Sequence, residues 1–327
     1  MKTLIITKRE IEKVLTPSVA NKTVERAFKA YGLGQADMPA KSYLYFENGD
    51  LRSMPAYIHG QGFDIAGIKS VTVHPENATY NLPTVIAVII LTDPNTGFPL
   101  AILDGTYLTS IRTGAAGALA VKYLSRKNAR IAGFVGCGVQ ARTQLTCIRE
   151  VRKLKTVKVW QFTPEDRYAP AFKKWAEKTY KLETIISPDI DAVTTGVDIL
   201  ITTTPSRKAL VQNVSPGTHI NAIGADAQGK QEIDPKILKQ AKVVIDDWAQ
   251  ALHSGEINVP LSRKQLTKKD IYGGLGDIVA GTQKGRASKE EITLFDSTGL
   301  AIQDVSCAYV VYQALKDKPG TKRVALY

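Results

Sequence analysis

Residues 133–141 read GFVGCGVQA, a glycine-rich turn that follows a short apolar run and precedes a stretch with helical spacing. Between a strand and a helix, such a turn can bind a dinucleotide pyrophosphate. Gly136 permits the tight turn, and Gly138 lets the phosphates approach the backbone. Ala141 takes the third position of the fingerprint, where a small residue lets the helix pack closely on the strand. A second predicted strand at 156–162 completes the βαβ unit. We therefore predict a pyrophosphate site made by Gly136, Gly138, Val139, Gln140 and Ala141.

The position that would contact the adenosine ribose is Gln161, at the end of the second predicted strand. A site selective for NAD usually has Asp or Glu here, which binds the ribose hydroxyl and repels a 2′-phosphate. Glutamine can bind the hydroxyl but does not repel the phosphate, and Thr163 and Arg167 follow closely. The sequence therefore predicts an NAD(P)H cofactor and leaves the preference between NAD and NADP open.

The chain around this turn alternates between short apolar runs and helical segments, which is typical of a doubly wound parallel sheet of the Rossmann type. We predict strands at 129–135, 156–162, 183–187, 198–203, 218–223, 242–246 and 292–296, and helices at 139–153 and 168–180.

The first hundred or so residues have a different pattern, indicating an α+β domain. Residues 41–58 alternate apolar and polar positions around Asn48-Gly49, a strong hairpin signal. Further elements are predicted as a helix at 22–34, strands at 65–73, 84–93 and 98–105, and helices at 106–128 and 301–317. The last helix is amphipathic and is expected to return to the first domain. We thus expect a substrate-binding and dimerisation domain over 1–115 and 305–327, and a dinucleotide-binding domain over 116–304.

Composition excludes several other classes of protein. The net charge of +12 is spread over short clusters without interleaved aromatic residues, which argues against a nucleic-acid partner. The longest uncharged apolar run, 82–91, is too short to cross a membrane. The four histidines lack zinc-like spacing, so no metal is expected, and three cysteines favour a reducing cytoplasm over a disulfide framework.

Three residues have a physical case for chemistry. Arg112 lies in a helical segment that is almost free of charge, where its planar guanidinium suits a carboxylate. Lys69 lies inside an apolar strand, and buried lysines often take catalytic roles. Asp226 directly follows a predicted strand, where open α/β sheets bind ligands and where a carboxylate can exchange a proton. The alternatives are a helix-surface arginine, a lysine on the solvent face of its strand, and a loop or N-cap aspartate.

Four stretches together resemble the ornithine cyclodeaminase/μ-crystallin family: SIRTGAAGALA at 110–120, GFVGCGVQA, NAIGADAQGKQEID at 221–234, and FDSTGLAIQD at 295–304. Within the family the chain looks most similar to the archaeal-type alanine dehydrogenases, which share TTTPSRK at 202–208 and GEIN at 255–258. The resemblance extends over essentially the whole chain. It implies a homodimer joined through the first-domain sheets.

The resemblance also implies roles for individual residues. It places substrate-carboxylate binding and basic catalysis on Lys41, Lys69 and Arg112, and acid–base catalysis on Asp226. The family usually has proline where this chain has Gln228. The further implied cofactor contacts are Thr113, Thr203, Thr204, Pro205, Ser297, Thr298 and Gly299.

Two family reactions compete for this site. A dehydrogenase reduces the imine of pyruvate and ammonia to alanine, whereas a cyclodeaminase converts ornithine to proline and ammonia. Cyclodeaminase-like members carry an acid where this chain has Arg52, and an arginine would repel the distal ammonium of ornithine. We therefore expect Arg52 to favour a short amino or keto acid, and alanine dehydrogenase to be the activity. The alternatives are ornithine cyclodeaminase, a ketimine or imine reductase, and a non-catalytic NADP-binding protein.

Overall fold

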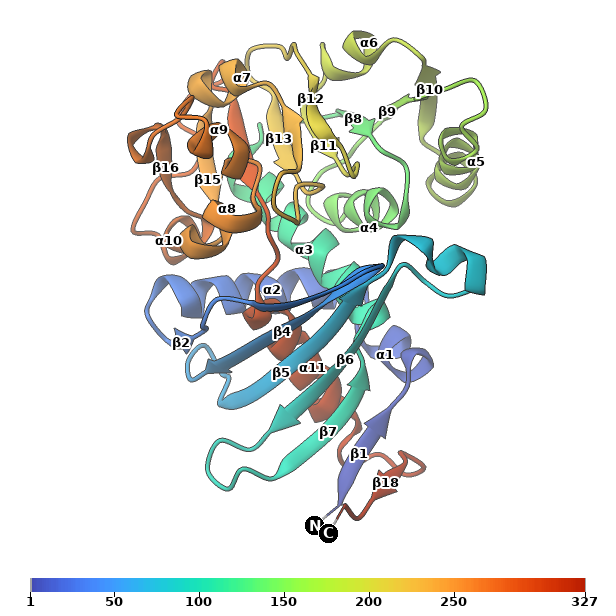
Figure 1. The fold of residues 1–327 in the computed structure, drawn as a ribbon, viewed down its shortest axis with the longest axis vertical. Coiled ribbons are helices and arrows are strands. Elements are labelled where there is room, and N and C mark those ends of the chain that lie inside the picture. The colour runs from blue at the N-terminus through green and yellow to red at the C-terminus, as the bar shows by residue number, and fades with distance from the viewer. Residues whose placement is uncertain (1, 327) are drawn as a thin grey trace. The chain divides into compact units, whose positions relative to one another are not determined.

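The computed structural model describes residues 2–326, and the chain divides into two compact units (Figure 1). Unit 1 comprises Met1–Thr113 with Leu300–Tyr327, and unit 2 comprises Gly114–Gly299. These boundaries lie two and five residues from the expected ones at 115/116 and 304/305, which stay predictions. The first falls inside an unbroken helix, α3 (Thr106–Leu124), and the second lies just before α11 (Ala301–Leu315), so that α11 belongs entirely to unit 1.

Unit 1 is built on a mixed eight-stranded sheet in the order β18-β1-β7-β6-β5-β4-β2, with β3 paired to β4. Only β1 and β7 run parallel, and the other neighbours are antiparallel. The strands are β1 (Thr3–Ile6), β2 (Ala36–Asp37), β3 (Ser42–Phe46), β4 (Gly49–Ile58), β5 (Ile65–Val73), β6 (Val85–Thr92), β7 (Pro99–Asp104) and β18 (Arg323–Val324). The predicted β3–β4 hairpin is confirmed; Phe46 pairs with Gly49, so the two-residue loop is Glu47-Asn48, one residue earlier than Asn48-Gly49.

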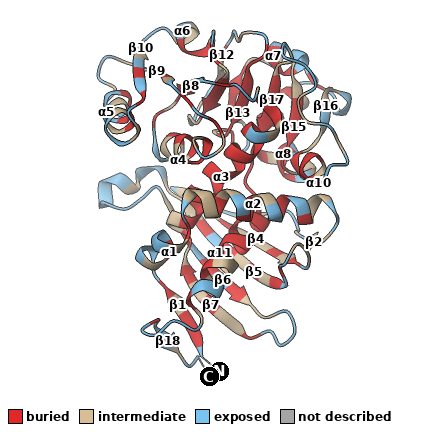
Figure 2. Ribbon diagram, turned by 180° about the vertical axis from the view of Figure 1, so that it is seen from behind, coloured by how far each residue is buried: buried red, intermediate tan, exposed pale blue. Residues whose placement is uncertain are grey.

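One face of this sheet is buried. Alternate residues of β4, from Arg52 to Ile58, are buried on it, and helix α11 packs against β4, β5, β6 and the helix α2 (Pro17–Gly32) (Figure 2). The return of the final helix to the first domain is therefore confirmed. Unit 1 also contains α1 (Lys8–Val14) and the 3₁₀ helix η1 (Pro75–Tyr80).

Unit 2 contains an eight-stranded parallel sheet in the order β10-β9-β8-β11-β13-β17-β15-β16. Its strands are β8 (Ile131–Val135), β9 (Thr156–Trp160), β10 (Glu183–Ser187), β11 (Ile199–Thr202), β13 (His219–Ala222), β15 (Lys242–Ile245), β16 (Ile271–Gly274) and β17 (Thr293–Asp296). The chain moves outward from β8 to β10 and then returns to β11 beside β8. The strand order thus reverses between β8 and β11, and ligands bind at such a point in open α/β sheets.

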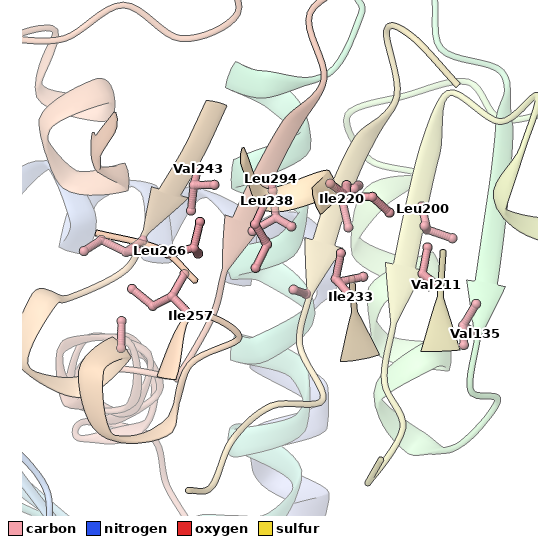
Figure 3. Close-up of a cluster of buried hydrophobic side chains, with 14 of the residues drawn as sticks. Val135, Leu200, Val211, Ile220, Ile233, Leu238, Val243, Ile257, Leu266 and Leu294 are labelled. Carbon is pink, nitrogen blue, oxygen red and sulfur yellow. The ribbon is translucent and has the colours of Figure 1, made fainter. Parts of the chain in front are cut away.

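The helices of unit 2 are α4 (Val139–Ile148), α5 (Tyr168–Tyr180), α6 (Ile190–Thr194), α7 (Pro235–Gln240), α8 (Trp248–Ser254), α9 (Asn258–Ser262), α10 (Leu275–Ala280) and the 3₁₀ helix η2 (Lys268–Asp270). A parallel ribbon pairs β12 (Arg207–Val211) with β14 (Gln231–Ile233). Buried aliphatic side chains from β8, β11, β13, β15 and β17 join those of the ribbon and nearby helices in one cluster (Figure 3). The predicted Rossmann-type parallel sheet is confirmed.

Candidate functional site

The glycine turn lies at the point where the strand order reverses. Gly136 follows β8 with φ +100°, and a Cβ atom added there would lie 2.8 Å from Oγ1 of Thr203. Thr203 follows β11, its amide donates to the carbonyl of Val135 at 2.9 Å, and its hydroxyl donates to the carbonyl of Gly136 at 3.2 Å. Glycine is therefore required at position 136 by both its backbone conformation and its neighbour.

Gly138 is the N-cap of α4 and has an ordinary φ of −77°. A Cβ atom added there would meet nothing within 4 Å, so the backbone borders open space. The first-turn N–H groups of Val139, Gln140 and Ala141 have no acceptor within their helix, and the helix dipole favours an anion beside them. Ala141 is fully buried against the sheet. This open, glycine-lined helix terminus fits a pyrophosphate group.

The loop after β9 carries the residues predicted to read the ribose. Gln161 is half-buried, and its Nε2 donates to the carbonyl of Pro164 at 3.3 Å. The carbonyl of Thr163 accepts from the amide of Asp166 at 3.0 Å. The guanidinium of the exposed Arg167 lies 5.6 Å from the ring centroid of Tyr168. The loop provides no acid at the position of Gln161, as the sequence showed.

The segment after β17 is bound by the buried carboxylate of Asp246. Asp246 accepts hydrogen bonds from the amide of Thr298 at 2.6 Å, from its hydroxyl at 2.9 Å, and from the amide of Gly299 at 2.8 Å. The amide of Ser297 donates to the carbonyl of Ala222 at 3.0 Å. These donors are already engaged, so a ligand contact here would involve carbonyl oxygens or the Ser297 hydroxyl. Contact with a nicotinamide carboxamide stays a prediction.

Unit 1 contains a buried ionic cluster made by Lys69, Arg112, Gln303 and Asp304, which we call the Asp304 cluster. The Nζ of Lys69, on β5, lies 2.7 Å from Oδ2 of Asp304 on α11, and Nε of Arg112, on α3, lies 2.9 Å from Oδ1. Arg112 also donates from Nη1 to Oε1 of Gln303 at 2.6 Å. Lys69 is 1% exposed and Arg112 5%, so neither is a surface residue. One carboxylate therefore holds two cations.

The charge balance of the Asp304 cluster affects Lys69 strongly. Burial, followed by repulsion from Arg112, lowers the pKa of Lys69 to about 7, and the Asp304 carboxylate only partly offsets this. An amine with this pKa can both accept and donate a proton near neutrality. Lys41 also lowers the pKa of Lys69, so the structure brings Lys41, Lys69 and Arg112 within electrostatic reach of one another.

Arg52 faces the same side of the sheet, two residues along β4 from Met54, which pairs with Lys69. It is not a bare cation. Its Nε and Nη2 donate to the two carboxylate oxygens of Asp50 at 2.7 and 3.0 Å. The argument that Arg52 repels a distal ammonium is therefore weakened, because Asp50 already neutralises the charge. Direct contact between Arg52 and the substrate stays a prediction.

Asp226 lies in unit 2, in the loop after β13, and forms an ion pair with Lys230. The carbonyl of Gln228 accepts from Nη1 of Arg207 at 3.3 Å, and the amide of Gly229 donates to Oδ1 of Asn258 at 3.1 Å. These contacts tie down the loop even though Gln228 replaces the usual proline. Two further residues were predicted to contact the cofactor. The hydroxyl of Thr113 donates to the carbonyl of Thr109 within α3, and Pro205 is exposed. Their contact with a cofactor stays a prediction.

Several residues of the Asp304 cluster in unit 1, and of the segment around Asp226 in unit 2, were not predicted. Asp304 and Gln303 lie in the quoted motif FDSTGLAIQD, and Asp304 is the only charged residue of helix 301–315, the same kind of signal that Arg112 gives in its own helix. The Nε2 of Gln303 is buried and has no hydrogen-bond partner among residues 2–326. Lys230 and Glu232 lie in the quoted stretch 221–234, but only the fold shows what they contact.

Other kinds of site receive no support from the described part of the chain. Within residues 2–326, no group of three or more His, Cys, Asp or Glu side chains could hold a metal ion. No helix in this range is long and apolar enough to cross a membrane.

Gly136, Gly138 and the first turn of α4 form what we call the glycine cradle. Together with the fold, this cradle defines a dinucleotide-binding protein of the Rossmann class, which also has an α+β unit containing the Asp304 cluster. The chain belongs to the ornithine cyclodeaminase/mu-crystallin family, whose model matches residues 1–319. An alanine dehydrogenase from Archaeoglobus fulgidus is 50% identical over 325 residues, covering 98% of both chains.

Solved structures are similar over the full length. A dimeric archaeal alanine dehydrogenase with bound NAD matches with a TM-score of 0.95 and 48% identity, covering 100% of both chains. The Δ1-pyrroline-2-carboxylate reductase of Thermococcus litoralis, in complex with NADH and L-proline, matches with a TM-score of 0.91 and 37% identity. That match covers 96% of this chain and 98% of the reductase.

Proposed function

We propose that the protein is an NAD(P)H-dependent alanine dehydrogenase that forms alanine from pyruvate and ammonia. The observation that carries the proposal is the Asp304 cluster, which supplies a buried guanidinium for a carboxylate and a lysine with a pKa of about 7. The full-length similarity to alanine dehydrogenases supports it.

The cofactor would be held by the amides of the first turn of α4 and by the backbone at Gly136 and Gly138, and it supplies the hydride that reduces the C=N bond. Arg112 and Lys41 bind the substrate carboxylate. Lys69 exchanges a proton with the substrate during imine formation, since its pKa lies near neutrality. Asp226 exchanges a proton with the substrate nitrogen. Charge and burial within unit 1 support the roles of Lys69 and Arg112, and the family resemblance supports those of Lys41 and Asp226.

The oligomeric state and the cellular location of the protein are also proposals. On the sheet face opposite to α11, Val88 and Ile90 of β6 are 44% and 37% exposed. An apolar sheet face of this kind suits contact with a second copy of the chain, and a similar structure is a dimer. We therefore propose a homodimer through the unit 1 sheet. The three buried, free cysteines agree with a cytoplasmic location.

The test follows oxidation of NADH and of NADPH spectrophotometrically with pyruvate plus ammonium. Oxidation that requires both pyruvate and ammonium supports the proposal. Parallel assays supply Δ1-pyrroline-2-carboxylate, and L-ornithine with detection of proline. Activity confined to the cyclic imine would make the protein an imine reductase. Formation of proline and ammonia from ornithine without net cofactor oxidation would replace the proposal with a cyclodeaminase.

A further inference from the structure

Three carboxylates of unit 2 are buried without a counter-ion. Glu232, Glu256 and Asp296 are each 0% exposed, and no lysine or arginine of residues 2–326 forms an ion pair with them. Instead they accept hydrogen bonds from backbone amides. Burying an unpaired carboxylate is costly, and burial raises the pKa of Glu232 to about 7. A neutral side chain would accept a backbone hydrogen bond at lower cost, so the use of ionisable carboxyl groups here calls for an explanation.

Glu232 bridges two loops that follow adjacent strands. Its Oε1 accepts from the amide of Thr204, after β11, at 2.6 Å, and its Oε2 accepts from the amide of Gly224, after β13, at 2.9 Å. Strands β11 and β13 are neighbours in the parallel sheet, so both amides lie at the carboxyl edge, where ligands bind. Each loop amide thus has its own oxygen of the Glu232 carboxyl group, and both oxygens are needed in this geometry.

The two bridged loops carry predicted functional residues. Thr204 lies within the predicted cofactor segment Thr203–Pro205. Gly224 lies two residues before Asp226, whose amide donates to the Gly224 carbonyl at 2.9 Å. No atom of Glu232 needs to touch a ligand for this arrangement to matter.

Glu232, with the two loops that it bridges, forms what we call the Glu232 clamp, and the backbone of Glu232 is in turn bound by a second buried carboxyl group. The backbone amide of Glu232 donates to Glu256 at 2.9 Å, and the amide of Glu256 donates to Asp296 at 2.8 Å. Asp296 ends β17, directly before the predicted cofactor residues Ser297–Gly299. Hydrogen bonds therefore connect Glu232, through Glu256, to the carboxyl end of a third strand, β17, at the same edge of the sheet.

We propose that Glu232 is a positioning residue that fixes the loop bearing Asp226 relative to the cofactor segment Thr203–Pro205. Its role in turnover rests on the function proposed above, whereas its role in holding the nucleotide segment does not.

The test compares Glu232→Gln with wild type and with Asp198→Asn. Glutamine keeps the shape but puts an NH2 donor in place of one oxygen, and this group cannot accept from the amide that faces it, so one of the two loops is released. Asp198 is the control because its Oδ2 also accepts two backbone amides, from Arg130 and Ile131 at 2.6 and 2.9 Å, at the amino ends of β8 and β11. It differs from Glu232 in that its Oδ1 pairs with Arg126. Three quantities are measured for each protein: the Kd for NADH by fluorescence, the steady-state constants for pyruvate and ammonium, and the thermal midpoint.

We expect Glu232→Gln to weaken NADH binding and to lower kcat roughly 100-fold, because small misplacements of reacting groups cost that much, while the KM for pyruvate stays nearly constant. Asp198→Asn should lower the thermal midpoint without either effect. If both variants lose stability alone, Glu232 is only structural and the proposal is overturned. If the wild type lacks turnover with pyruvate, the proposed function fails, and the NADH affinities still decide the role of Glu232.

Hydrogen exchange of the wild type provides a second test, which is independent of whether Glu232→Gln folds. NADH binding should slow amide exchange in residues 203–206 and also in residues 223–226. Slowing in the first segment alone would show that the loops are not coupled, and it would overturn the proposal.

Discussion

Lys69 and Asp304 form a buried ion pair in which Nζ and Oδ2 lie 2.7 Å apart, joining β5 to α11 although the two residues are far apart in the sequence. The same carboxylate also binds Arg112, so the position of each cation depends on α11. Residues from the two chain segments that make up unit 1 thus form one acid–base group.

Replacement of Lys69 by methionine should slow catalysis strongly without loss of nucleotide binding. Methionine fills a similar space but cannot exchange a proton, so we expect kcat to fall roughly 10²- to 10⁴-fold. The glycine cradle lies in unit 2, so the Kd for NADH should stay within a factor of two or so of wild type. Lys8→Met, which removes an exposed lysine of α1 that pairs with Glu12, serves as the control. Full turnover by Lys69→Met would exclude a role for this amine.

Asp304 should set the pH dependence of the reaction. Its carboxylate raises the pKa of Lys69, opposing the lowering caused by burial and Arg112, which together leave that pKa at about 7. Asp304→Asn removes the stabilisation of the charged amine, so the pKa of Lys69 should fall further. The midpoint of the kcat/KM profile for pyruvate that reports this amine should therefore move to lower pH. The exposed Asp64→Asn should leave the profile in place, and a shift to higher pH for Asp304→Asn would contradict the assignment.

Arg112 should act on substrate affinity. Arg112→Gln keeps a hydrogen-bonding side chain but removes the charge, and charge-assisted hydrogen bonds are worth enough to raise the KM for pyruvate roughly 10- to 100-fold. The Kd for NADH should change little. If instead the KM for pyruvate is unchanged and only the thermal midpoint falls, Arg112 serves the packing of α11 and not the substrate.

The sequence predicted those features that depend on local patterns. The β3–β4 hairpin, the parallel sheet and the glycine turn each leave a periodic or glycine signal, and all three are present in the structure. The Asp304 cluster was predicted only in part, because Lys69 and Arg112 stood out in apolar segments whereas their shared partner is supplied by tertiary packing. The Asp50–Arg52 pair was not predicted, although residues two apart on a strand face the same side and the spacing of the two residues in β4 offers that signal.

Gly138 offers a test of the cradle that is separate from folding. An added Cβ atom would meet nothing within 4 Å, so Gly138→Ala should keep the thermal midpoint of wild type. If the pyrophosphate occupies that open space, the methyl group should raise the Kd for NADH roughly 10-fold. Gly136→Ala should instead destabilise the fold, because φ is +100° and Thr203 is too close. Unchanged NADH affinity in Gly138→Ala would place the nucleotide elsewhere.

Asp296 should make the stability of unit 2 depend on pH. Burial raises its pKa from 3.8 to about 7, so between these values the folded protein retains a proton that the unfolded chain releases. The contribution of Asp296 to stability is therefore greatest at low pH and declines as pH rises to about 7, above which it is constant. Asp296→Asn lacks this dependence. Between pH 5 and pH 8, the unfolding free energy of the variant relative to wild type should improve by on the order of 2 kcal/mol, measured by urea denaturation. Asp64→Asn provides the baseline, and a difference between Asp296→Asn and wild type that is constant with pH would show that Asp296 is ionised throughout this range.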